Sequence, residues 1–241
     1  MGNESNESLA VQGLPSGEAA LLKAVWAGAM GWTVRCTPRR RTLALDLPDG
    51  RRWFVKLRTG FSRAANREWN WLHTLPLLGF RTPTPVYREQ RLTGSLVCTR
   101  ALSGRPMDVV WQEAADRGST DALVAWAVAV VAPMVRRLHG AGLVHRDLYW
   151  NHLLQDPDRP DAEPFLLDVE RVFAPRWRFR RWVVKDLAGL LASLPVEVRP
   201  TDRLRFLRAY CGGVLAAGWK DLAEQVEHKA QRIRRHVPRY G

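Results

Sequence analysis

The stretch VHRDLYWNHLL, residues 144–154, constrains the fold more than any other part of the 241-residue sequence. An apolar residue leads into His145-Arg146-Asp147, four residues intervene, and His152 precedes a second apolar run. This spacing predicts a loop between a helix and a short strand. In such a loop the Asp147 carboxylate can face a hydroxyl group, and a side chain five residues later can face a metal ion.

The same layout, H-R-D followed by four residues and Asn, forms the catalytic loop of protein kinases, where Asp is the base and Asn binds Mg²⁺. Here the fifth position after Asp147 is His152, and Asn151 stands one residue earlier. The sequence leaves open which of the two meets the metal. Because the tripeptide alone occurs by chance, its meaning depends on the residues around it.

The composition allows one domain, or two lobes that share a cleft. The formal net charge is +13, with dense positive charge in residues 35–52 and 171–185. Such charge attracts nucleic acid, an anionic membrane surface or a phosphorylated substrate. We expect no nucleic-acid partner, because the sequence has no zinc-finger spacing and no RNA-binding aromatic signature. Three widely spaced cysteines fit a reducing compartment.

The N-terminal residues 1–17 are small and polar and are predicted to be disordered. They show no apolar core of a signal peptide, and Asn6 breaks the myristoylation pattern that Gly2 begins. The longest apolar run, residues 122–135, is too short to span a bilayer and contains Pro133. We therefore expect a buried helix there.

The first hundred residues predict a small lobe built on a sheet. A short helix is expected over residues 18–30 and a longer one over residues 63–75, with a linker at residues 99–106. Turn signals between β-type runs indicate an antiparallel arrangement. The expected strands cover residues 32–36, 42–47, 53–58, 86–89 and 96–99.

The third expected strand, WFVKLR, carries Lys56 among apolar residues, and Glu68 is the only acidic residue of the helix that follows. A lysine in a strand and a glutamate in a helix are most often solvent-facing residues. In kinase-like folds, however, a lysine of the third strand binds the α- and β-phosphates and pairs with a helical glutamate. The order of these elements predicts that Lys56 and Glu68 form such a nucleotide-binding pair.

The second half of the chain is predicted to be mostly helical. One long helix should begin at Thr120 or Asp121 and end near His139. The other expected elements are helices over residues 106–117 and 176–191, two helices after residue 201, and short strands over residues 153–155 and 164–169.

Two aspartates of this half complete the pattern. Asp168 follows an apolar strand about twenty residues after Asp147, where kinases place the aspartate that holds Mg²⁺. The alternative is an aspartate that caps a turn. Asp186, expected near the start of its helix, either accepts hydrogen bonds from the catalytic loop or favours the helix N-terminus.

Lys56, Glu68, Asp147, His152 and Asp168 occur in the order that Mg²⁺-dependent phosphoryl transfer requires. This reaction needs cations on the phosphates and a base aimed at the acceptor hydroxyl. Lys56 would bind the α- and β-phosphates, His152 and Asp168 the metal, and Asp147 would orient and deprotonate the acceptor.

Two departures argue against a protein substrate. No glycine-rich loop lies between the first two strands, where Arg39-Arg40-Arg41 would contact phosphate through side chains instead. The interval from Asp168 to Asp186 is also too short for the usual activation segment. It forms either a cradle for an anionic acceptor or a solvated basic face. Its basic residues are Arg171, Arg176, Arg178, Arg180, Arg181 and Lys185.

The sequence resembles the bacterial lipopolysaccharide kinases, which phosphorylate heptose or Kdo sugars of the lipopolysaccharide inner core. The resemblance covers roughly residues 30–195. The resemblance implies an α+β protein with a reduced two-lobed protein-kinase-like fold. Residues 18–99 would form a small antiparallel β-sheet N-lobe with one main helix, and residues 100–241 a mostly helical C-lobe. The matching segments are FVK at 54–56, NREW at 66–69, LGFRTPTPV at 78–86, HRDLYWNHLL at 145–154, LLDVER at 166–171 and RWVVKDLAGLL at 181–191.

The resemblance also implies ATP, Mg²⁺ and a cytoplasmic position at the inner membrane, where the lipid-linked anionic core is exposed. His152 resembles the heptose-kinase branch, in which it would bind the metal, whereas Glu170-Arg171 resembles the Kdo-kinase branch. We expect transfer of the ATP γ-phosphate to a heptose hydroxyl. Kdo, a protein or a small hydroxyl compound such as an antibiotic stay open as acceptors. An inactive kinase-shaped nucleotide-binding module also stays open, because the glycine-rich loop is missing.

Overall fold

The computed structural model describes residues 16–60, 62–195, 197–214 and 218–235. The chain forms two compact units: Met1–Asn70 with Thr84–Ala101, and Trp71–Pro83 with Leu102–Gly241. The predicted disordered segment, residues 1–17, falls almost wholly outside the described residues. The predicted lobe boundary at residue 99 stays a prediction.

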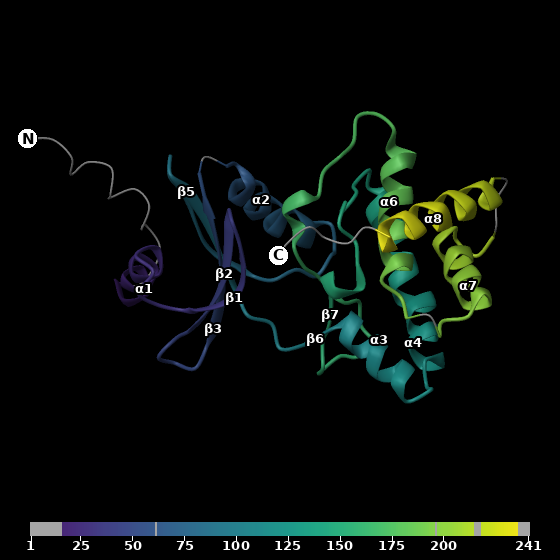
Figure 1. Cartoon of the computed structure of the whole chain (residues 1–241), viewed down its shortest axis with the longest axis horizontal. Coiled ribbons are helices and arrows are strands. Elements are labelled where there is room, and N and C mark those ends of the chain that lie inside the picture. The colour runs from purple at the N-terminus through teal and green to yellow at the C-terminus, as the bar shows by residue number, and fades with distance from the viewer. Residues whose placement is uncertain (1–15, 61, 196, 215–217, 236–241) are drawn as a thin grey trace, which may run out of the picture. The chain divides into compact units, whose positions relative to one another are not determined.

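An antiparallel sheet is the centre of the first unit (Figure 1). Its five strands follow the order β1-β2-β3-β5-β4. All the expected strands are present, each shifted by no more than about two residues at either end. The strands are β1 (Trp32–Thr37), β2 (Arg40–Asp46), β3 (Arg52–Thr59), β4 (Pro85–Gln90) and β5 (Gly94–Arg100). One detail was wrong: residues 37–41, left between the first two expected strands, contain a turn of only two residues, because Arg40 and Arg41 already pair with β1.

The two faces of this sheet have different partners. Trp53 and Val55 of β3 are fully buried and pack with Leu22 and Val25 of α1 (Ser16–Trp26). Because side chains alternate along a strand, Lys56 lies on the other face, toward α2 (Ala64–Leu77). The sheet therefore separates an apolar layer from a charged one.

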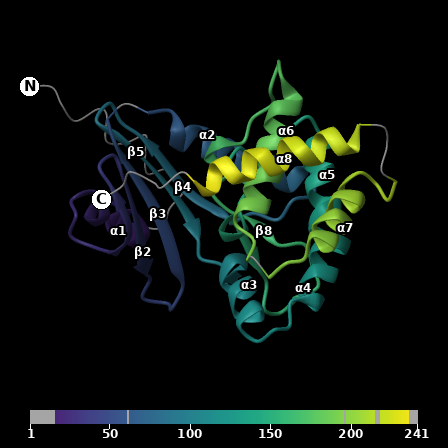
Figure 2. The ribbon, with the colours of Figure 1, turned by 45° about the vertical axis from the view of Figure 1, so that its right-hand side comes forward.

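Helices make up most of the second unit, and α8 packs across α6 (Figure 2). The expected helix over residues 176–191 begins only at Phe179, because Arg178 before it has a positive φ of 54° that a right-handed helix does not accept. Asp186 lies in the middle of α6, whereas the sequence had predicted a position near the helix start. The helices are α3 (Met107–Asp116), α4 (Asp121–Trp126), α5 (Ala132–Gly140), α6 (Phe179–Ala192), α7 (Pro200–Tyr210) and α8 (Trp219–Arg234).

The long helix of this unit runs without a break from Asp121 to Gly140, with a π-helical segment, Ala127–Val131, between α4 and α5. The wider turn stands just before Pro133, which has no N–H for the regular ladder. Its 20 residues are long and apolar enough to cross a membrane by length and composition. The length of this helix therefore does not exclude a membrane span. From the sequence, the apolar run had been expected to be too short for one. Its buried residues, Val131 and Val135 among them, belong to the core of this unit.

A small three-stranded sheet, in the order β6-β7-β8, frames the functional loop. Its strands are β6 (Arg105–Pro106), β7 (Leu153–Gln155) and β8 (Phe165–Leu166). The first lies inside the expected linker and was not predicted. Because β7 follows His152 directly and β8 ends just before Asp168, their pairing brings the two candidate metal ligands to the same end of the sheet.

Candidate active site

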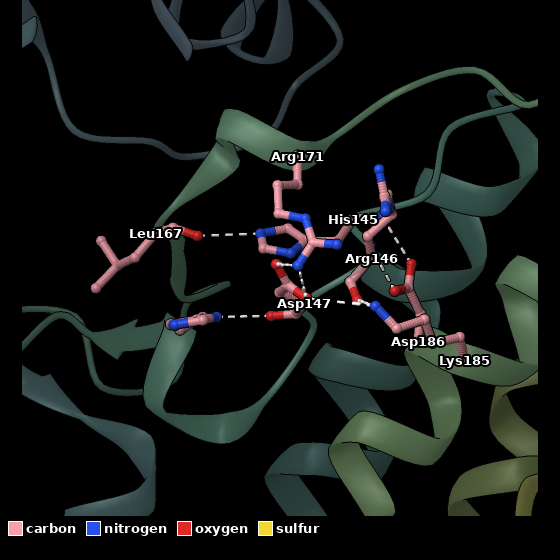
Figure 3. A network of polar contacts seen from close by, with 8 residues as sticks. His145, Arg146, Asp147, Leu167, Arg171, Lys185 and Asp186 are labelled. Carbon is pink, nitrogen blue, oxygen red and sulfur yellow. Dashed lines mark hydrogen bonds and ion pairs between the residues drawn. The ribbon is translucent and has the colours of Figure 1, made fainter. Parts of the chain in front are cut away.

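The HRD loop is anchored on a single buried carboxylate. The backbone N–H groups of His145 and Arg146 each donate to Asp186, at 2.7 Å (Figure 3). Asp186 is fully buried in the middle of α6. Arg146 has a φ of 72°, a strained conformation for a non-glycine residue. This conformation lets two successive amides converge on one carboxylate, so Asp186 anchors the loop, the first of its two expected roles.

His145 links this loop to the candidate metal ligand. Its side chain is fully buried, and its Nε2 donates to the Leu167 carbonyl over 3.0 Å. Burial lowers the pKa of His145, which favours the neutral ring. Because Leu167 immediately precedes Asp168, this bond holds the Asp147 loop beside the Asp168 backbone.

Asp147 lies between two cations. Nη1 of Arg171 contacts its two carboxylate oxygens at 3.0 and 2.8 Å, and Nζ of Lys185 lies 3.3 Å from Oδ1 (Figure 3). Lys185 also donates to the carbonyl of Arg146. Burial lowers the pKa of Lys185, and the charge of Asp147 opposes that shift. Asp147 keeps about 19% of its side chain exposed, so it is fixed yet accessible.

His152 is held by the same loop. Its Nδ1 donates to the carbonyl of Asp147 over 2.6 Å, which leaves Nε2 as the acceptor nitrogen of the neutral ring. Metal-binding histidines commonly carry such an orienting bond. Asn151 beside it is exposed and Asp168, with a φ of 52°, is half-buried. The carboxylate of Asp168 suits Mg²⁺, which prefers oxygen, and Nε2 of His152 can add a nitrogen ligand.

The ion pair expected between Lys56 and Glu68 is present in the first unit. Lys56 of β3 forms an ion pair with Glu68 of α2. Arg58 also contacts Glu68, with its Nη2 3.2 Å from Oε2. Glu68 is 2% exposed, so its charge is buried and compensated by two cations.

The basic segment divides into two groups. Arg171 and Lys185 contact Asp147, and Arg180 pairs with Asp221 of α8. Arg176 and Arg178 are exposed, as are Trp177 and Arg181. Trp177 is 81% exposed, an uncommon position for a tryptophan. Only the second group of side chains has the freedom to bind an external anion.

The family model of the lipopolysaccharide kinase (Kdo/WaaP) family matches residues 52–210. This chain belongs to that family. The match includes every residue of the two clusters described above. The chain is therefore a kinase, a phosphotransferase of α+β fold, as the sequence predicts.

Known relatives agree with this assignment. Lipopolysaccharide core heptose(I) kinase WaaP of Pseudomonas aeruginosa is 31% identical over 231 residues, covering 84% of this chain and 86% of the relative. The protein of the same description from Escherichia coli K12 is 28% identical over 242 residues, covering 84% and 87%.

Solved structures share the fold. The structure of WaaP in complex with acyl carrier protein matches with a TM-score of 0.72 at 31% identity, covering 88% of this chain and 96% of that one. An aminoglycoside-3′-phosphotransferase of type VIII matches with a TM-score of 0.59 at 19% identity, covering 89% and 100%, which shows a common fold alone.

Sequence reasoning missed two features of this kinase site. It placed Arg171 and Lys185 in either an acceptor cradle or a solvated basic face, whereas both contact Asp147. It also overlooked Arg58, although a second cation two residues after Lys56 on the same strand was a usable signal, since both project from one face. The predicted roles of Lys56, Glu68, Asp147, His152 and Asp168 stay predictions.

Proposed function

We propose that this kinase transfers the γ-phosphate of ATP to a heptose hydroxyl of the lipopolysaccharide inner core. The observation that carries the proposal is an accessible carboxylate, Asp147, held by two cations on a family-specific loop. The family assignment and the two WaaP relatives support the sugar acceptor. Phosphoryl transfer needs a positioned carboxylate that acts as the base for the acceptor hydroxyl, and Asp147 on this loop would take that role.

Each cluster of the site has a part in this proposal. Lys56, held by Glu68, would bind the α- and β-phosphates. Asp168 and His152 would hold Mg²⁺, which when bound neutralises charge on the transferring phosphate. Asp147 would orient the acceptor hydroxyl and take its proton. Arg171 and Lys185 keep the Asp147 carboxylate in one position.

The acceptor would meet the exposed residues after the Asp147 cluster. Arg176, Arg178 and Arg181 offer positive charge to the anionic core, and Trp177 offers an apolar ring that can stack on a sugar face. A solvated basic face is the alternative. The exposed tryptophan between arginines favours the binding role, because solvation alone gives no reason for it.

The defining experiment measures ATP turnover with Mg²⁺ in the presence and absence of purified lipopolysaccharide core. We expect core-dependent phosphate transfer, lost in Asp147→Asn, which keeps the size of the side chain but removes its charge. Cores that lack heptose phosphate or Kdo phosphate identify the acceptor sugar. Transfer to Kdo alone would move the proposal to the Kdo-kinase branch that Glu170-Arg171 resembles.

Binding data separate the kinase from an inactive binding module. A melting temperature raised by ATP and Mg²⁺, with no transfer to either sugar, to protein or to small hydroxyl compounds, would support the module. Wild-type turnover retained in Asp147→Asn would remove Asp147 from the base role and contradict the proposed mechanism.

An acyl carrier protein is a proposed partner, because a related WaaP has been solved in complex with one. The second unit contains a pocket of about 410 Å³ with mostly apolar walls, which suit an acyl chain better than a sugar. Co-elution with an acyl-loaded carrier, but not with the unloaded one, is the expected result; co-elution with neither would contradict it. The lining includes Val124, Ala127, Leu187, Leu190, Leu207 and Val226.

The proposed place of action is the cytoplasmic surface of the inner membrane, where the lipid-linked core is exposed. The net charge of +13 favours an anionic surface. We expect the kinase to co-sediment with vesicles that contain anionic lipid and to stay in solution with neutral ones. Equal sedimentation with both would contradict electrostatic attachment.

A further inference from the structure

The turn between β1 and β2 differs from the glycine-rich loop that covers the phosphates in protein kinases. It consists of Pro38 and Arg39 alone, closed by the pair Thr37 and Arg40. Residues 32–46 contain no glycine. Because proline has no N–H, this turn cannot present a run of backbone amides to a phosphate.

The strand register nevertheless directs positive side chains to one face of the sheet. Side chains opposite each other in antiparallel strands project from the same face. Arg35 of β1 is opposite Thr42 of β2, which is opposite Lys56 of β3. Two residues along, Arg40 of β2 is opposite Arg58 of β3. Arg35 and Arg40 therefore share a face with Lys56 and Arg58.

Side-chain contacts confirm which face this is. Lys56 and Arg58 both contact Glu68, so their face is the one toward α2. Arg41 is opposite Leu57, which packs against the apolar core beside α1. The Nη2 of Arg41 lies 3.3 Å from the hydroxyl of Thr33 on that side. The expected triplet of phosphate-binding arginines is thus split, with Arg40 and Arg41 on opposite faces.

The α2 face gathers positively charged side chains. Arg35, Arg40, Lys56 and Arg58 lie on it, and Glu68 of α2 contacts the last two. Arg35 is exposed and Arg40 is half-buried, so both can reach a ligand beside Lys56.

We propose that Arg35 and Arg40 bind the nucleotide triphosphate through their guanidinium groups, in place of the amides of a glycine-rich loop. The inference rests on the proposed use of ATP. A guanidinium group binds phosphate with two parallel N–H bonds, whereas Lys56 acts as a point charge. The β1–β2 hairpin then holds the triphosphate with side chains that project from strands, and it needs no flexible loop.

Isothermal titration of ATP and of adenosine, each with Mg²⁺, tests the proposal in the full chain. Arg35→Ala and Arg40→Ala are each expected to weaken ATP binding about tenfold, the usual loss for a hydrogen bond to a charged group. Adenosine affinity should not change, because adenosine carries no phosphate. Arg41→Ala is the matched control: it removes the same charge from the other face and should leave both affinities unchanged.

The ratio of ATP to adenosine affinity is the deciding readout, because damage to the fold lowers both affinities together. A ratio unchanged in Arg35→Ala and Arg40→Ala, or changed equally by Arg41→Ala, overturns the proposal. If the wild-type protein binds ATP and phosphorylates the core while the variants give either of these results, the proposed function stands and only this site is refuted. A wild-type protein that binds no ATP refutes the proposed function itself, and the site with it.

Discussion

At the scale of single residues, Asp147 is the side chain whose surroundings say most about the chemistry. It is accessible, and its carboxylate contacts Arg171 and Lys185 on two sides. An unsupported carboxylate at a loop tip would rotate freely, and catalysis suffers when a reacting group is misplaced by about 1 Å. In the proposed mechanism, Arg171 and Lys185 are therefore positioning residues that act through Asp147.

Arg171→Ala is predicted to lower kcat about tenfold to a hundredfold and to leave the KM for ATP unchanged, because it frees Asp147 without touching nucleotide. Arg171→Lys should restore part of kcat, since it returns the charge but not the planar group. Steady-state kinetics with saturating core measure both. Arg176→Ala is the comparison variant. Because Arg176 is a proposed acceptor contact, its loss should raise the KM for the core. An Arg171→Ala enzyme with a raised KM for the core would return Arg171 to the acceptor cradle.

His145 leads to a prediction about stability and pH. Burial lowers its pKa in the folded state below the ordinary value near 6.5, so the unfolded chain binds the proton more readily. The contribution of neutral His145 to the free energy of unfolding is therefore complete above about pH 6.5. It is lost as the pH falls from there toward the folded pKa, by up to about 1.4 kcal/mol for each pH unit.

Denaturant unfolding between pH 5 and pH 7.5 checks this window. His145→Gln cannot take up the proton in either state, so its free energy of unfolding should fall less steeply below pH 6.5 than that of the wild type. The slopes are compared, not the absolute stabilities, because the substitution also changes packing. Parallel slopes would show that His145 does not titrate differently in the two states.

At the scale of elements, α6 determines where the catalytic loop lies. Asp186 in its middle binds two loop amides, and Gly189 one turn later faces the Leu148 backbone. A Cβ atom at Gly189 would overlap the carbonyl oxygen of Leu148. The contact between helix and loop is therefore closer than any other residue allows.

Gly189→Ala is predicted to lower the free energy of unfolding by about 2 kcal/mol, the cost of overpacking a tight contact. It should also lower kcat, because it displaces the residue that follows Asp147. Gly140→Ala is the matched control: Gly140 is the last residue of α5, and a Cβ there meets nothing within 4 Å. Thermal unfolding and turnover of both variants decide. Equal stabilities would mean that the loop yields to the methyl group without strain.

The elements that the sequence predicted well are those with a local signal. Alternating apolar residues bounded by turns located all five strands, and the order of strand and helix led to the pair of Lys56 and Glu68. The two-residue strand β6 was missed, because so short a run has no period and forms only where β7 is beside it.

The rest of the site depends on backbone conformations that side-chain type does not encode. Arg178 adopts a positive φ and delays the start of α6, and Arg146 adopts one to direct two amides at Asp186. Glycine, asparagine or aspartate would have signalled such turns, whereas arginine does not. Arg171 meets Asp147 across 24 residues of sequence, a contact set by the path of the loop between them.

At the scale of the whole molecule, net charge and local charge make different contributions to acceptor binding. The chain carries a formal charge of +13, which attracts an anionic core from any direction. Exposed charges are screened beyond about 10 Å at 0.1 M salt. At high ionic strength, only residues in contact with the acceptor should still matter.

Arg178→Ala combined with Arg181→Ala is predicted to raise the KM for the core about tenfold at 50 mM salt and to keep a deficit at 500 mM, because it removes direct contacts. Arg232→Ala combined with Arg235→Ala removes the same charge from the C-terminal end of α8, where both side chains are exposed. That control should weaken binding slightly at 50 mM and match the wild type at 500 mM. Two variants with the same salt dependence would show that the acceptor senses only total charge, and that residues 176–181 form a solvated basic face.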